Sequence, residues 1–355
     1  MKTIMLNAKG LAIALLGAIL AKYLHIPLPW LLGPLLAALF MGSVGKPLSC
    51  HSHWRKGGQI IIGMALGLYF TPALVQAISA YWGFILLGIL WSLVLGTMLA
   101  VLQYRINKVD WATAWFSSAI GSASEMVNIA EQYNAQVDKV VAAHSLRIVI
   151  LVVLVPIFMG LYFQVEWSDL IVQDTERYGF DQVLLLFLLA LFTGKIFQYF
   201  NFLNAWILGP LTIIGLLSFF GILQFRFPEW FIAFGQLCIG WSLGSKFPFS
   251  FLKNSKKFIG LTVLFNLLAL ALSIIFALLL IRLSHADTQI LILGLSPGGI
   301  AEMSLMAKAL GLAVPIVVAF QLSRLIFVIL TTRFFYQRSL QLLFKSMNKS
   351  QEMDH

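Results

Sequence analysis

The sequence has few charged residues for its length. Asp, Glu, Lys and Arg make up only 11% of its 355 residues, whereas 60% are hydrophobic and the mean hydropathy is +0.91. Soluble proteins carry about 25% charged residues. The shortage of charge excludes an ordinary soluble domain and predicts an integral membrane protein made of many helices.

Cysteine and histidine are also scarce. The 2 cysteines, Cys50 and Cys238, are too few for a disulfide framework or a thiol metal site. Cys50-His51-x-His53 contains metal-ligating residue types, but it has no counterpart elsewhere, so we interpret it as part of a solvated basic loop. No phosphate-cradling P-loop motif occurs. We therefore expect no cofactor and no resident metal, which argues against oxygenase chemistry that needs a redox metal.

The net charge of +10 does not indicate a nucleic-acid-binding protein. The lysines and arginines lie in short loops and near the C-terminus, where the positive-inside bias of membrane proteins accounts for them. We expect membrane lipid and a small molecule or ion as partners, and no nucleic acid.

The chain contains an internal duplication. Trp30-Leu-Leu-Gly-Pro-Leu recurs as Trp206-Ile-Leu-Gly-Pro-Leu, and at nearly the same offset Glu125 corresponds to Glu302. Apolar helices that resembled each other by chance would not align charged residues as well as glycines, so we infer two homologous halves. Each half contains about six hydrophobic segments.

Charge predicts that the two halves are inverted. The first half has a basic loop after its second segment, whereas the second half has one after its third. Both chain ends are basic and the linker at 166–182 is acidic, which places the ends inside and the linker outside. We divide the chain into a first membrane repeat (1–165), an acidic extracytoplasmic linker (166–182), a second membrane repeat (183–340) and a cytoplasmic tail (341–355).

Inversion requires an odd number of crossings in each half. We therefore predict an all-α, polytopic transmembrane protein with two inverted repeats of about five crossings, each with one re-entrant or broken helix. The fifth segments are the candidates, because a glycine-rich stretch interrupts each. The alternative is twelve full crossings with parallel halves.

The two interrupted segments each combine glycine, a helix-start signal and a carboxylate. They read Gly121-Ser-Ala-Ser-Glu125 and Gly298-Gly-Ile-Ala-Glu302. Irregular backbone and charge persist at membrane depth only beside protein or a water-filled cavity, so the pair predicts a two-part site near the middle of the membrane. Each glutamate could carry a proton or sodium ion, or could only cap its helix.

Polar residues around these breaks complete the predicted site. Arg147 and Arg324 could bind an anionic substrate, or could pair with the glutamate of their own repeat. His144 could relay protons, although its counterpart is glutamine. The predicted substrate or ion site comprises Glu125, Glu302, Arg147, Arg324, Ser122, Ser124, Asn128, Ser296, Gly298, Gly299, Gln59 and Gln236.

The third segment of each half has small residues spaced for close helix packing. The spacing is Gly63-x-x-x-Gly67 in the first half and Gly240-x-x-x-Gly244 in the second. We expect these helices to let two bundles slide past each other. Gln59 and Gln236 begin the same helices, and joining neighbouring helices is their favoured role over contacting a substrate.

The stretch from Ser296-Pro-Gly-Gly-Ile-Ala-Glu-Met to Gly311, followed by Gln321-Leu-Ser-Arg324, resembles the signature of the bacterial AbrB-type membrane proteins. That family is likewise duplicated, and the resemblance covers essentially the whole chain. It implies an architecture similar to inverted-repeat ion and organic-anion transporters. Family labels also include a regulator of gene expression and an ammonia monooxygenase.

These features favour a secondary transporter of the bacterial inner membrane. It would move a small molecule or ion, such as an organic anion or weak acid, together with H+ or Na+. A membrane-bound regulator of gene expression is the alternative, and a membrane monooxygenase has the weakest support. We expect no enzymatic activity, and a homodimer is an open alternative to a monomer.

Overall fold

The computed structural model describes residues 2–26, 28–121, 123–163, 180–202, 204–223, 227–246, 255–282 and 286–353. Within these ranges the regular structure is α-helical throughout, which confirms the all-α prediction. Five of the described helices are long and apolar enough to cross a membrane, and α2 and α10 are shorter apolar helices. Most of the predicted linker (166–182) lies outside the described residues.

The helices of the two halves follow each other in the same order. The first half contains α1 (Lys2–Tyr23), α2 (Pro29–Ser43), α3 (Ser52–Gly67), α4 (Pro72–Ala80), α5 (Trp82–Asn107), α6 (Trp111–Ser118), α7 (Ala123–Gln132) and α8 (Val137–Phe163). The second contains α9 (Phe180–Tyr199), α10 (Ala205–Phe219), α11 (Glu229–Ser245), α13 (Lys256–Arg282), α14 (Thr288–Leu295), α15 (Ile300–Ala309) and α16 (Val314–Met353).

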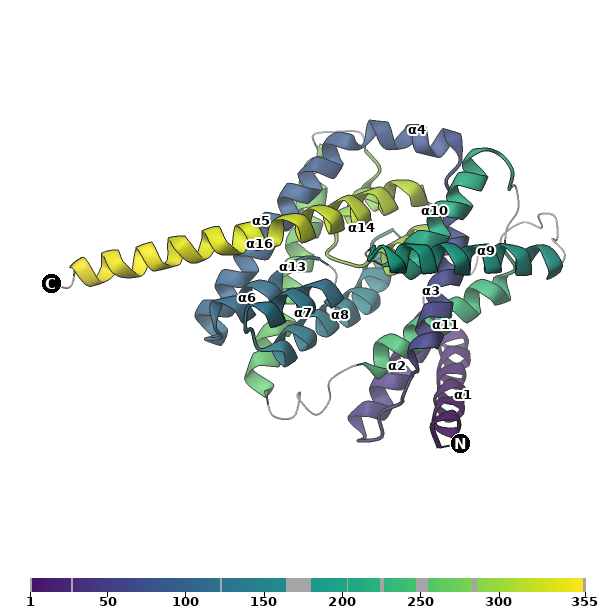
Figure 1. Ribbon diagram of the computed structural model, residues 1–355, viewed down its shortest axis with the longest axis horizontal. Coiled ribbons are helices and arrows are strands. Elements are labelled where there is room, and N and C mark those ends of the chain that lie inside the picture. Colours follow the sequence, from purple (N-terminus) through teal and green to yellow (C-terminus); the bar gives the residue numbers. More distant parts are fainter. Residues whose placement is uncertain are drawn as a thin grey trace.

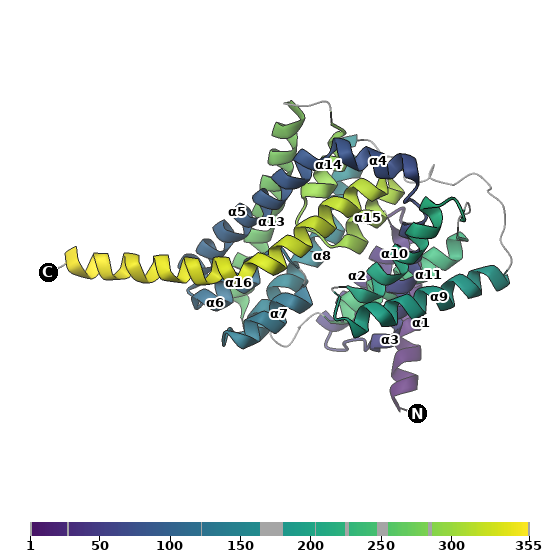
Figure 2. The same cartoon turned by 45° about the horizontal axis from the view of Figure 1, so that its top comes forward.

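The helices form two groups, each drawn from both halves (Figure 1). Bundle A consists of α1, α2 and α3 with α9, α10 and α11. Bundle B consists of α5 to α8 with α13 to α16. Helix α4 runs along one edge between α3 and α5 and packs on α16 (Figure 2). The chain therefore passes from bundle A to bundle B once in each half.

Glycine holds the helices of bundle A close together. A Cβ atom at Gly63 would lie 2.5 Å from the Ile207 carbonyl oxygen of α10, and one at Gly244 would lie 2.6 Å from the Leu35 carbonyl oxygen of α2. Gly67 likewise faces α10, and Gly240 faces α2. The third helix of each half thus packs against the second helix of the other half. These glycines lie inside bundle A, so they are not the sliding face between bundles that the spacing suggested.

Bundle B contains both interrupted segments. Each is a short helix, an extended break and a second short helix: α6 and α7 in the first half, α14 and α15 in the second. An 8-residue helix such as α6 is only about 12 Å long, so neither member could cross a membrane alone. Asp110 and Asp287 begin these units by accepting hydrogen bonds from backbone amides of α6 and α14.

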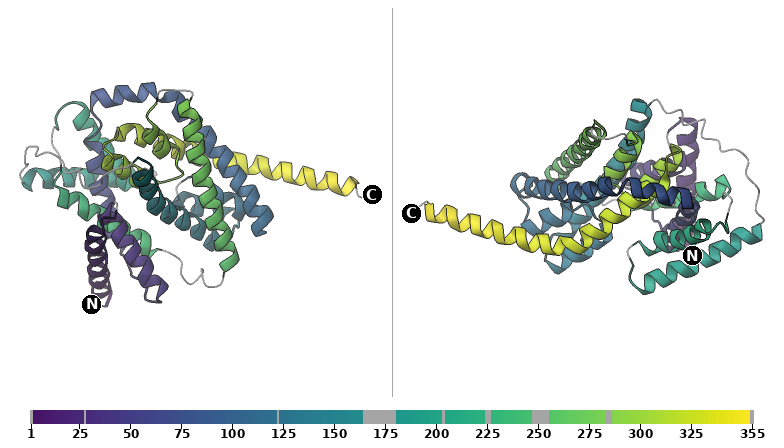
Figure 3. Two further views of the ribbon diagram at one scale, coloured as in Figure 1. Left: turned by 180° about the vertical axis from the view of Figure 1, so that it is seen from behind. Right: turned by 90° about the horizontal axis from the view of Figure 1, so that it is seen from above.

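The last helix includes most of the predicted tail. Helix α16 continues without a break to Met353, so most of the predicted cytoplasmic tail (341–355) is helical, and its cytoplasmic location stays a prediction. It projects away from both bundles to the C-terminal end, on the side opposite α1 (Figures 1 and 3). One helix therefore connects the interior of bundle B with the chain end.

Candidate functional site

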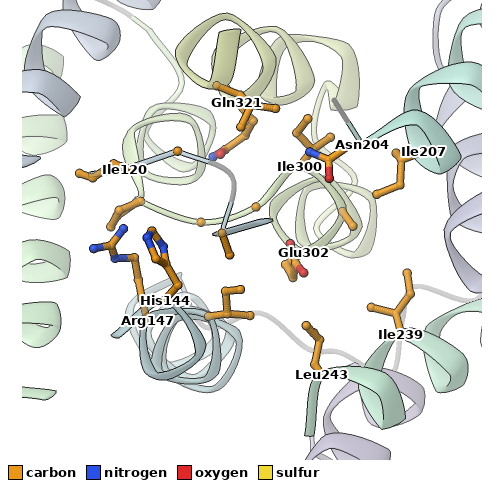
Figure 4. Close-up of a pocket in the computed structure, with 18 of the residues that line it drawn as sticks. Ile120, His144, Arg147, Asn204, Ile207, Ile239, Leu243, Ile300, Glu302 and Gln321 are labelled. Carbon is orange, nitrogen blue, oxygen red and sulfur yellow. The ribbon is translucent and has the colours of Figure 1, made fainter. Parts of the chain in front are cut away.

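A polar pocket lies between the two bundles (Figure 4). Its volume is about 120 Å³, enough for a few water molecules, an ion or a small organic acid. Bundle A contributes Arg55, Gln59, Asn204, Ile207, Ile239 and Leu243. Bundle B contributes both breaks, with the described residues 120, 121, 123 and 297–302, and the side chains of His144, Arg147, Gln321 and Arg324. The breaks expected from the sequence therefore meet at one place.

The two arginines hold the ends of the short helices. Arg147 donates to the carbonyl oxygens of Ser117, Ser118 and Ala119 at 3.0, 3.1 and 2.8 Å. Those carbonyls end α6, where no further helical turn can satisfy them. The guanidinium group also faces the negative end of the α6 dipole. Arg147 thus stabilises a backbone break that would otherwise be unfavourable away from water.

Arg324 does the same for the second break. Its Nη1 donates to the Ser296 carbonyl oxygen at 2.7 Å and its Nη2 to the Gly298 carbonyl oxygen at 2.6 Å. Both arginines are buried, with 5% and 6% of their surfaces exposed. Within the described part of the chain, their hydrogen bonds go to carbonyl and amide oxygens and not to Glu125 or Glu302. The ion pair with the glutamate of the same repeat is therefore not the arrangement that the structure shows.

His144 and Gln321 occupy equivalent positions in the two halves. The His144 Nε2 lies 2.9 Å from the Phe116 carbonyl oxygen, and the Gln321 Nε2 donates to the Leu293 carbonyl oxygen at 2.7 Å. Because a carbonyl only accepts, the Nε2 of His144 carries the proton. Histidine and glutamine thus support the same backbone contact, which explains how the two residue types replace each other.

Glu302 is the predicted carboxylate that reaches the pocket. It lies in the first turn of α15, whose N-cap is Gly299, and Figure 4 shows it between His144 on one side and Ile239 on the other. A Cβ atom at Gly299 would overlap the Glu302 carboxylate, so only glycine leaves room for this side chain to fold back toward the helix start. Helix capping and a role in the pocket are therefore compatible for the same carboxylate.

Glu125 is placed differently. It lies in the first turn of α7 and is partly buried, but it is not among the described residues that line the pocket. The predicted Ser122, and the side chains of Ser124 and Asn128, lie outside what the structure describes. Gln236 is partly buried in α11 and also outside the described lining. The two halves therefore contribute unequally to the pocket.

Arg55 is a pocket residue that the sequence did not assign to the site. It stands four residues before Gln59 on α3, so both face the same way. It lies close enough to Glu302 for their charges to attract. The sequence suggested only a basic loop, and the spacing from Gln59 was the signal that could have assigned Arg55 to the site.

The Cys50-His51-x-His53 stretch is not entirely a loop, because α3 begins at Ser52. The His51 Nδ1 accepts a hydrogen bond from the His53 backbone at 3.4 Å and caps this helix. Burial raises the pKa of the Cys50 thiol to about 11. Among the described residues no group of three metal-ligating side chains is close enough to hold an ion.

The fold and the pocket define a polytopic α-helical membrane protein, built by duplication, with a polar cavity between two bundles. The family profile described as "Transition state regulatory protein AbrB" matches residues 30–339. The chain therefore belongs to the AbrB family, and the expected resemblance is confirmed.

Two curated relatives cover most of the chain. "Putative regulator AbrB" of Escherichia coli (strain K12) is 24% identical over 315 residues, which are 86% of this chain and 88% of the relative. "Uncharacterized protein YhjN" of Bacillus subtilis (strain 168) is 22% identical over 351 residues, 92% of this chain and 91% of the relative.

Proposed function

We propose that this protein is a secondary transporter of the bacterial inner membrane that carries a small organic anion or weak acid together with H+ or Na+. The observation that supports this most directly is the pocket between the bundles. It combines buried guanidinium groups with Glu302 at a helix break. In this proposal the halves are inverted in the membrane, with both chain ends in the cytoplasm.

The charge of the pocket favours an anion. The described lining residues include the positively charged guanidinium groups of Arg55, Arg147 and Arg324. The carboxylate of Glu302 is the negatively charged group among them. Arg147 and Arg324 are close enough for their charges to repel. The N-terminus of α15, which carries partial positive charge, faces the same space. An anion would reduce the repulsion between the guanidinium groups and would be attracted by the partial positive charge of this helix start.

Glu302 supplies the coupling in this proposal. A carboxylate away from bulk water is most stable when a proton or a metal cation neutralises it. A bound cation at Glu302 would also remove the negative charge that opposes an incoming anion. Binding of the two solutes would therefore be mutually favourable, which is the thermodynamic condition for cotransport.

The contacts between the bundles suit alternating access. The closest approaches across the pocket are α15 with α3 and α11 with α8, whereas contacts within each bundle are far more extensive. Movement of bundle B along bundle A would carry both breaks, with Glu302 and Arg324, from one side of the membrane toward the other.

The test begins with the purified protein. Acetate, lactate, succinate and inorganic phosphate are screened by thermal shift, because a ligand of the native state raises the melting temperature. Uptake of each stabilising anion into proteoliposomes is then measured under imposed H+ and Na+ gradients. We expect Glu302→Gln to abolish gradient-driven uptake and the matched variant Glu125→Gln to retain it. Gradient-driven uptake that is unchanged in Glu302→Gln would refute the coupling role.

A regulatory function is the second candidate, because one relative is named "Putative regulator AbrB". The Glu302→Gln variant also distinguishes a regulatory function from transport. If deletion of the gene alters transcription and Glu302→Gln restores it as well as the wild type, the regulatory role does not depend on coupled transport.

A further inference from the structure

The two buried arginines differ at a single nitrogen. All three guanidinium nitrogens of Arg147 are bonded, since its Nε donates to the Asn266 side-chain oxygen at 3.1 Å. Arg324 uses both terminal nitrogens in the same way. Its Nε is buried and has no hydrogen-bond partner among the described residues. The Nε–H of Arg324 in the second half is therefore available to a ligand, whereas the Nε–H of Arg147 in the first half is bonded within the chain.

The duplication explains the difference. Arg147 and Arg324 are related by an offset of 177 residues. At the same offset, Asn266 of α13 corresponds to Ile89 of α5. Isoleucine has no acceptor. The neighbouring Gly88 packs against Leu295 of α14 and Phe320 of α16, the helix that carries Arg324, and from the duplication we infer that Ile89 takes the place that Asn266 has beside Arg147. Arg147 therefore has an asparagine as its partner within the chain, whereas the residue at the corresponding position for Arg324 is an isoleucine.

An unpaired donor on a buried guanidinium group is unfavourable unless something outside the chain binds it. Arg324 lines the pocket, and the first turn of α15, where the helix dipole places partial positive charge, lines the same wall. An oxygen of a carboxylate or phosphate group satisfies such donors best, because the hydrogen bond is assisted by charge.

We propose that the Nε of Arg324, with the N-terminus of α15, binds the acid group of the ligand, and that Arg147 has a purely structural role. The inference rests on the proposed function and narrows it. The substrate is an oxyanion, and its acid group lies against the second half. Substitution of Ile89 and Asn266, with both arginines kept, distinguishes ligand binding by Arg324 from the structural role of Arg147.

The decisive pair of variants is Ile89→Asn and Asn266→Ile. Ile89→Asn provides Arg324 with the internal acceptor that Arg147 has, so it should weaken binding of the anion at least tenfold. Asn266→Ile removes the acceptor from Arg147 and leaves the Arg324 donor in place, so anion affinity should not fall below that of the wild type. The probes are sodium acetate and sodium phosphate, with neutral acetamide as the control ligand, in isothermal titration of detergent-solubilised protein.

Folding is checked independently, because asparagine at a buried site of α5 could prevent assembly. A second measurement avoids that variant: wild-type protein with 15N-labelled arginine is titrated with acetate, and the Nε–H resonances are followed by NMR. One resonance, identified by its loss in Arg324→Lys, should shift on addition of acetate and not of acetamide. An unshifted Arg324 resonance, or a folded Ile89→Asn variant with wild-type affinity, would overturn the assignment.

These outcomes are distinct from failure of transport. If acetate binds as described but no gradient drives its uptake, the binding assignment stands and the transporter proposal fails. If uptake is gradient-driven and Ile89→Asn leaves its KM unchanged, the transporter proposal stands and the assignment to Arg324 fails.

Discussion

Replacing Arg147 by methionine tests whether this arginine holds the first helix break. Methionine keeps much of the volume but removes the donors to three carbonyl oxygens at the end of α6. A buried hydrogen bond to a charged group contributes about 1.5–3 kcal/mol, and an acceptor left unpaired costs a similar amount. Loss of the desolvation cost of the guanidinium group offsets part of this. The expected loss of unfolding free energy is roughly 3 kcal/mol.

The assay is equilibrium unfolding in mixed micelles, followed by tryptophan fluorescence. Asn266→Ala is the control, because it removes one hydrogen bond of Arg147 and leaves the carbonyls satisfied, so it should cost only about 1 kcal/mol. Arg147→Lys should fall between the two, since an ammonium group cannot reach all three carbonyls at once. A folded Arg147→Met protein within 1 kcal/mol of the wild type would show that the break does not depend on this side chain.

Three further predictions concern glycines and a thiol. Gly240→Ala should destabilise the protein by about 1–3 kcal/mol, because its Cβ would meet the backbone of α2, whereas Gly260→Ala, with nothing within 4 Å, should be close to neutral in the same unfolding assay. Gly299→Ala should displace the Glu302 carboxylate and raise the H+ or Na+ concentration that half-saturates uptake, while the melting temperature changes little; unchanged half-saturation would contradict the placement. Cys50, whose thiol pKa is raised to about 11 by burial, is protonated at neutral pH and should react slowly with maleimide, at a rate that grows through pH 10 when the other cysteine is replaced by serine. A rate that levels off near pH 9 would indicate an ordinary thiol instead.

The sequence predicts the local features of this fold well. Repeated motifs predict the duplication, and glycine beside Glu302 predicts a helix start at a break. Both depend on residues close together in the chain. Apolar composition likewise predicts membrane helices, of which five meet the length and hydropathy of a span.

The contacts between distant segments could not be predicted in the same way. Arg147 satisfies carbonyls that lie 28 to 30 residues earlier, and nothing in its own surroundings distinguishes this role from binding a substrate. Arg55 enters the pocket only because α3 turns one face toward α15. The different placement of Glu125 and Glu302 relative to the pocket also depends on packing, although Ser122 stands where the second half has Gly299.

The exchange of partners within bundle A has a consequence for how such a protein could arise and be built. Helix α3 packs on α10 and α2 packs on α11, so a single half, made alone, would leave its glycine faces without a neighbour. A single-copy chain would therefore need a second, identical subunit to cover these faces.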